Sequence, residues 1–152
     1  MDEASLQNPY LLTIALTIST SLSSFSFCPS DTFRLLRKLD TAFASLLQGS
    51  SIETNQPLPG FESGYGPPSM TEKVRLRGIV ERTRVLIVEV AGKSGSVTEA
   101  SLTDDFAMTE EDDEVSETGL DDSHDTWEME IARVYQHTLT RLNTSLQSPE
   151  SI

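Results

Sequence analysis

The chain has 152 residues, a net charge of −13 and 37% hydrophobic residues, which allows one domain of ordinary size. Its apolar fraction lies below the roughly 45–50% of globular domains, a figure that also counts Gly, so part of the chain should stay outside the core. The single cysteine, Cys28, excludes an intrachain disulfide framework and fits a reducing compartment.

The acidic residues are concentrated in one stretch. Between Glu99 and Asp125 there are 12 Asp and Glu and no Lys or Arg, whereas the rest of the chain holds 12 acids and 11 bases. A segment of such charge and low hydrophobicity cannot bury enough surface to offset its ordering entropy. We therefore predict that residues 93–125 form an acidic disordered segment.

The first segment, residues 1–28, is rich in Ser and Thr and has no charge after Glu3. Its charged end is acidic, whereas a signal peptide would begin with basic residues. Its most apolar part, residues 10–18, is too short to span a bilayer, which takes about 20 residues. We therefore expect no membrane role and an intracellular protein.

Apolar residues in this segment follow at spacings of three and four from Leu11 to Phe25, which predicts a helix. Asn8 can cap this helix, and Pro9 suits its first position. The β-branched residues Ile14 and Ile18 would also suit a strand.

Residues 29–92 are predicted to form a helical hairpin around a Pro/Gly-rich linker, residues 49–69. The stretch "SDTFRLLRKLDTAFASLLQG" begins with Ser30 or Asp31 as a cap and ends at Gly49, which is placed for a C-terminal cap. One face is apolar, made by Phe33, Leu36, Leu39, Phe43 and Leu46 or Leu47.

The stretch "SMTEKVRLRGIVERTRVLIVEV", residues 69–90, is predicted to form the second helix of the hairpin. Ser69 and Glu72 make a capping box, and Gly92 can end the helix. Residues 85–90 have strand composition, so a strand there is the alternative. At 100° per residue one arc of about 120° is apolar, made by Leu76, Ile79, Val80, Thr83, Leu86, Ile87 and Val90.

Five of the 11 basic residues lie in this helix. Arg75 and Arg82 flank one edge of the apolar arc, and Lys73, Arg77 and Arg84 flank the other. A DNA-tracking helix would more usually gather such charges on one exposed side, and the acidic segment would repel phosphate. We therefore expect the arginines to bury their stems along apolar surface or to pair with acids of a neighbouring helix.

A last amphipathic helix is predicted over residues 126–148, with Asp125 as its cap. Its stripe consists of Trp127, Ile131, Val134, Tyr135, Thr138, Leu142 and Leu146. Such helices bury their stripes only against each other or against a partner. The fold class predicted is all-α: a small antiparallel helical bundle of three to four helices with long disordered linkers.

The sequence offers no catalytic, metal-binding or cofactor-binding pattern. His124 and His137 lie thirteen residues apart and far from Cys28, and neither C-x-x-C nor H-E-x-x-H occurs. "AGKSGS" lacks the first glycine of a phosphate loop, because Ile87 stands there. We interpret Cys28 as a small buried apolar residue and expect neither an enzyme nor a bound cofactor.

The acidic stretch sets Phe106 and Met108 among carboxylates, a mixture that can dock on basic partners with apolar grooves. A solvated linker is the alternative. Ser101, Thr109 and Thr118 each have an acid three residues on, which acid-directed kinases favour.

The order "LLRKLDTAFASLLQG", a linker holding "LPGF", then "SMTEKVRLRGIVERTRVLIVEV" and a C-terminal helix resembles a fungal family, the eleventh subunit of the general transcription factor TFIIH. The resemblance covers residues 30–90 and, more loosely, the last helix, but not residues 1–28. It implies a nuclear, non-enzymatic protein associated with release of the DNA translocase subunit from TFIIH. It supplies no catalytic residues.

These observations predict a subunit of a nuclear transcription or repair assembly that binds proteins, TFIIH subunits including the translocase among them. The alternative is a helical adaptor of chromatin or meiotic chromosome complexes that contacts DNA through the basic helix. Whether the helices fold alone or on binding stays open. The residues predicted to bind a partner are Arg75, Leu76, Arg77, Ile79, Arg82, Arg84, Phe106 and Met108.

Overall fold

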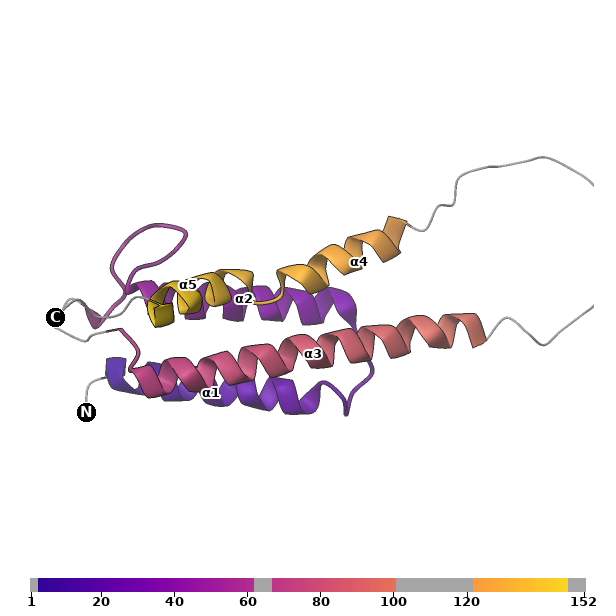
Figure 1. Cartoon of the computed structure of the whole chain (residues 1–152), viewed down its shortest axis with the longest axis horizontal. Helices are drawn as coiled ribbons and strands as arrows, with labels where there is room; N and C mark the ends of the chain where they lie inside the picture. The colour runs from indigo at the N-terminus through magenta and orange to yellow at the C-terminus, as the bar shows by residue number, and fades with distance from the viewer. Residues whose placement is uncertain (1–2, 62–66, 101–121, 148–152) are drawn as a thin grey trace, which may run out of the picture.

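The protein is an all-α bundle, as predicted, and the computed structural model describes residues 3–61, 67–100 and 122–147. The helices are α1 (Glu3–Ser21), α2 (Pro29–Gln48), α3 (Met70–Ala100), α4 (Asp122–Arg133) and α5 (Gln136–Gln147). Helices α1, α2 and α3 alternate in direction, and α4 and α5 both run opposite to α3 (Figure 1).

Two pairs of helices make the closest contacts, α2 with α5 and α1 with α3 (Figure 1). The core is built from buried residues of all four of these helices. Small buried residues on α1 and α2, such as Ala15, Ser19 and Ala44, allow neighbouring backbones to approach closely. Large side chains complete the core, and fully burying each aliphatic one contributes about 1.5–3 kcal/mol relative to exposure. The largest fully buried apolar side chains are Tyr135, Leu36, Ile87, Leu142 and Val80.

Helix α1 begins at Glu3, earlier than the predicted start at Pro9, so Pro9 lies inside the helix and Asn8 does not cap it. The segment is a helix and not a strand, and its exposed β-branched residues fit because Thr13 and Thr17 donate hydrogen bonds to carbonyls four residues earlier. Among the described helices, none is long and apolar enough to cross a membrane.

Helix α2 buries the predicted stripe and ends as predicted. Gly49 adopts the left-handed conformation, with φ 79°, and its N–H donates to the Ser45 carbonyl at 2.8 Å. The start differs from the prediction, because Cys28 is the cap residue and makes no capping side-chain bond. Cys28 is also exposed, not buried, since its position before Pro29 lies outside the helical stripe.

The first part of the expected linker is an ordered loop. Ser51 and Gln56 pair through their backbones, and Leu58 and Phe61 pack against the core. Gly60 has φ 91° at the turn that brings Phe61 back toward Gly49. This packing supplies apolar contacts that composition alone did not indicate, because Pro, Gly and Ser dominate the stretch.

Helix α3 starts with the predicted capping box: the Ser69 N–H donates to the Glu72 carboxylate at 2.8 Å, and the Glu72 N–H donates to Ser69 Oγ at 3.3 Å. Residues 85–90 are helical, not a strand. The prediction that the helix ends at Gly92 is wrong: α3 continues to Ala100, and Gly92 does not adopt the left-handed conformation of a helix end.

The single helix predicted over residues 126–148 is interrupted. Helix α4 ends at Arg133 and α5 begins at Gln136, although the sequence has neither Gly nor Pro there. The acidic segment predicted to be disordered, residues 93–125, is helical at both ends, because α3 runs to Ala100 and α4 begins at Asp122. Asp125 therefore lies inside α4 and does not cap it. The middle of the segment, residues 101–121 with Phe106 and Met108, lies outside the described residues.

Two glycines should respond in opposite directions to replacement by alanine. Gly49→Ala should lower the free energy of unfolding by about 1–2 kcal/mol, because φ is +79° and the new Cβ would lie 3.2 Å from Phe61 Cδ1. Gly78→Ala should raise it by about 0.5–1 kcal/mol, since its Cβ would meet no atom within 4 Å in the helix α3. Urea unfolding followed by circular dichroism measures both changes. Equal shifts in the free energy of unfolding would contradict the different backbone conformations given to Gly49 and Gly78.

Candidate protein-binding surface

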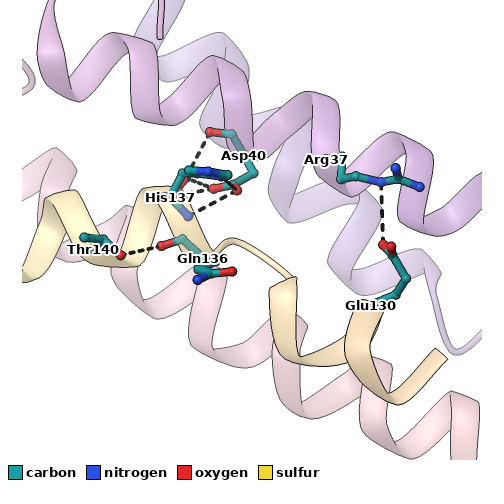
Figure 2. Close-up of polar contacts among 7 residues, drawn as sticks. Arg37, Asp40, Glu130, Gln136, His137 and Thr140 are labelled. Carbon is teal, nitrogen blue, oxygen red and sulfur yellow. Dashed lines mark hydrogen bonds and ion pairs between the residues drawn. The ribbon is translucent and has the colours of Figure 1, made fainter. Parts of the chain in front are cut away.

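A buried carboxylate on α2 holds the start of α5 (Figure 2). Asp40 is 4% exposed, and its Oδ1 accepts hydrogen bonds from the Thr138 N–H at 2.8 Å and the Thr138 hydroxyl at 2.7 Å. Its Oδ2 accepts from the His137 N–H at 3.2 Å and lies 2.8 Å from His137 Nδ1. Asp40 thus caps α5 from another helix, satisfying N–H groups that its first turn leaves free.

Tyr135 lies at the break between α4 and α5. This residue has φ 55°, a left-handed conformation that is costly for a residue with a side chain. The turn places its ring in the core, 1% exposed and 6.3 Å from the ring of Phe43 on α2. The cap by Asp40 and the packing of this ring offset the strain of the turn.

Helix α4 is held more weakly than α5. Arg37 Nε on α2 lies 3.6 Å from Glu130 Oε2 on α4, and the arginine side chain is largely exposed (Figure 2). An ion pair of this kind contributes about 0–1 kcal/mol. Of the polar contacts that tie the last two helices to α2, those of Asp40 are the most buried.

The predicted partner-binding arginines lie on the sides of α3 that face away from the core. Arg75, Arg77 and Arg82 are exposed and Arg84 is half-buried. Within the described part of the chain, only Arg77 of these four has an ion pair, with Glu81 at 2.9 Å. Lys73, in contrast, is used internally: its Nζ donates to Ser145 Oγ of α5 at 2.7 Å.

The two apolar residues predicted to bind a partner face inward. Leu76 is 3% exposed and belongs to the core, and Ile79 is partly buried and packs against it. The chain itself therefore covers the apolar arc of α3. Phe106 and Met108 lie outside the described residues, so their predicted role stays a prediction.

Sequence reasoning overlooked the apolar residues on the outward face of α3. Val74, Val85 and Val88 are 58%, 65% and 58% exposed. The sequence contains a signal for this second face, because these valines recur at helical spacing on the side opposite the main apolar arc. The prediction for α3 rests only on the main arc. The signal for the Asp40 junction was an acid in the middle of the apolar stripe of α2.

The described residues offer little for catalysis. A surface cleft of about 750 Å³ lies where the end of α2 meets the start of α3 and the end of α5. Its described lining holds Lys73 and Arg141 but no His, Cys, Asp or Glu. Arg141 donates to Gln48 Oε1 at 2.8 Å, so it is engaged within the fold. No group of three or more potential metal ligands occurs in the described ranges.

The chain matches a known protein family. The family model described as subunit 11 of the general transcription factor TFIIH matches residues 2–143. This range includes the Ser/Thr-rich first segment, which the sequence resemblance had left out. No curated protein and no solved structure matches the chain.

The Asp40 junction should be a main determinant of stability. Asp40→Ala removes the acceptor of two amides and leaves the buried Thr138 hydroxyl only the longer bond to the Asp40 backbone carbonyl, so the free energy of unfolding should fall by about 3 kcal/mol. Hydrogen exchange at the His137 and Thr138 amides should accelerate. In the control Glu89→Ala, which removes an exposed acid on α3, the change should stay within about 0.5 kcal/mol. A loss no larger than that control's would contradict the capping role.

Tyr135 should make the fold sensitive to alkali. Burial, with a smaller effect of the Asp40 charge, raises the pKa of Tyr135 above its ordinary value. The unfolded tyrosine ionises above about pH 10 while the folded one stays neutral, so stability should fall as pH rises beyond that value.

Tyr135→Phe should remove this part of the decline and change stability at neutral pH by less than about 1 kcal/mol, because the hydroxyl has no hydrogen-bond partner among the described residues. Urea unfolding at about pH 7 and about pH 11 measures both effects. Tyr10→Phe, at an exposed position, is the control. If the stability of Tyr135→Phe fell between these two pH values as much as that of the wild type, ionisation of Tyr135 would not be the cause of the loss.

Proposed function

The chain belongs to the family of subunit 11 of the general transcription factor TFIIH, and from this we propose that it is a non-enzymatic subunit that binds other proteins of that assembly. The place of action is then the nucleus. The specific action that we propose is release of the DNA translocase subunit from the rest of TFIIH.

The observation that carries the proposal is the division of α3 into two faces. The inward face is covered by the chain's own helices, so the fold does not need a partner to bury it. The outward face presents arginines beside exposed valines, a combination that suits protein contact. Phe106 and Met108 remain a second proposed contact.

Release of a subunit has a thermodynamic requirement. A binding protein shifts an assembly equilibrium only if it binds the separated state more tightly than the assembled state. We therefore place the contact of α3 on a surface of the translocase, or of its docking site in TFIIH, that the intact assembly covers. An added chain then competes for that surface without any chemical step.

The DNA-binding adaptor remains the competing hypothesis. It requires the arginines of α3 to contact phosphates, which would give an affinity that falls steeply with salt. The arginines stand on both sides of exposed valines and Glu81, an arrangement that offers phosphates no continuous basic stripe.

The proposal is tested with TFIIH immobilised through a subunit other than the translocase. Adding the wild-type chain should release the translocase into the supernatant, as quantified by immunoblot. Arg75→Glu with Arg82→Glu should reduce the release by about tenfold or more, since both exposed charges would repel the surface they now attract.

The matched control is Arg34→Glu with Lys38→Glu, which reverses two exposed charges on α2 and should leave release unchanged. Failure of the wild-type chain to bind or release the translocase at physiological salt would refute the proposed function. Duplex DNA binding that only the α3 variant loses would favour the adaptor.

A further inference from the structure

Helix α3 carries two seams of the same period. The buried seam on its inward face follows spacings of four and three: Leu76, Val80, Thr83, Ile87 and Val90. A second set of residues begins two positions before Leu76 and lies on the exposed face of the helix. Its members follow spacings of four, three, four, three and four. We call this set the outer seam: Val74, Gly78, Glu81, Val85, Val88 and Gly92. This spacing is that of a helix that packs lengthwise against another helix.

In the described part of the chain, no contact or backbone conformation requires glycine in the outer seam. A Cβ at Gly78 or Gly92 would meet no atom within 4 Å, and neither residue adopts a left-handed conformation. Glycine in a helix costs stability relative to alanine, so the fold gains nothing from either residue. Gly78 lowers the surface between Val74 and Val85, and Gly92 lowers it beyond Val88, which lets the backbone of another helix approach closely.

The charges beside the outer seam match one kind of partner. Four arginines flank the outer seam, Arg75 and Arg82 on one side and Arg77 and Arg84 on the other. The exposed Glu89 lies beside Arg82, and Arg77 pairs with Glu81 at 2.9 Å, so basic residues are in excess but not alone. In a pair of packed helices, residues in these flanking positions form ion pairs across the interface and select the partner by charge. The excess of arginines therefore favours a helix whose flanking residues are Asp or Glu.

We propose that the outer seam binds an amphipathic α-helix of another protein, with an apolar stripe edged by acidic residues on both sides. This rests on the proposed function in placing that helix in a protein of the TFIIH assembly. A second copy of the chain does not fit, because its arginines would face the same arginines. Nucleic acid does not fit the apolar middle of the seam. Glu81 lies within the seam, and a basic residue of the partner opposite it would fix the register.

The test uses the purified full chain and two synthetic helical peptides of about three heptads, both with Leu in the seam positions. One peptide has Glu at the flanking positions and the other has Lys. Fluorescence anisotropy should give binding of the Glu peptide about tenfold tighter than that of the Lys peptide, weakening as salt is raised. Arg75→Glu with Arg82→Glu should reduce or reverse this preference.

Gly78→Phe tests the seam itself. The position is open to solvent, so the variant should stay folded by circular dichroism while its affinity for the Glu peptide falls about tenfold or more. The control Asn143→Phe places the same side chain on an exposed position of α5 and should bind as the wild type does.

Several results would overturn the proposal: equal binding of both peptides, no binding of either, or full affinity of Gly78→Phe. Self-association in sedimentation that Gly78→Phe abolishes would assign the seam to a second copy, and displacement of the Glu peptide by duplex DNA would assign it to nucleic acid.

Failure of the proposed function is separate from failure of the docking proposal. A wild-type chain that binds the Glu peptide but releases no translocase contradicts only the proposed function. A Gly78→Phe chain that still releases the translocase contradicts only the docking seam.

Discussion

The architecture depends on one buried carboxylate. Asp40 stands in the middle of the apolar face of α2, where an unpaired charge would be costly. It is tolerated because the first turn of α5 supplies two N–H groups and a hydroxyl, and because the positive end of that helix lies against it. The bond pattern requires α5 to begin at that position beside α2, and this forces the chain to turn at Tyr135.

This constraint reaches the functional surface through packing. With α5 fixed against α2, and α1 against α3, the inward seam of α3 is fully used within the chain. The outer seam then remains an exposed apolar strip flanked by arginines on a helix that the chain's own packing already forms. A surface on a folded helix can bind without the entropy cost of folding, which suits a subunit that contacts other proteins. The protein thus has a stabilising face and a free face on the same helix.

Features that depend on neighbouring residues could be predicted from the sequence. The stripe of α2, the capping box at Ser69, the left-handed Gly49 and the inward arc of α3 follow from helical period and local backbone chemistry. The early start of α1, the exposure of Cys28 and the ordered loop at Phe61 were not foreseen. Packing of Phe61 against the core outweighed the loop composition, and Cys28 lies outside the helical stripe. The early start of α1 has no structural explanation.

The sequence by itself determined the helical class, the two main apolar faces and the position of four basic residues on α3, because period and composition fix which face of a helix is apolar. Only the tertiary structure decided that Leu76 and Ile79 face the chain's own core and that the valines of the outer seam stay exposed. It also decided the break at Tyr135, since the acceptor that makes the break favourable is Asp40, 95 positions earlier in the chain. No local pattern contains that information, because a cap supplied by another helix exists only after the two helices have packed.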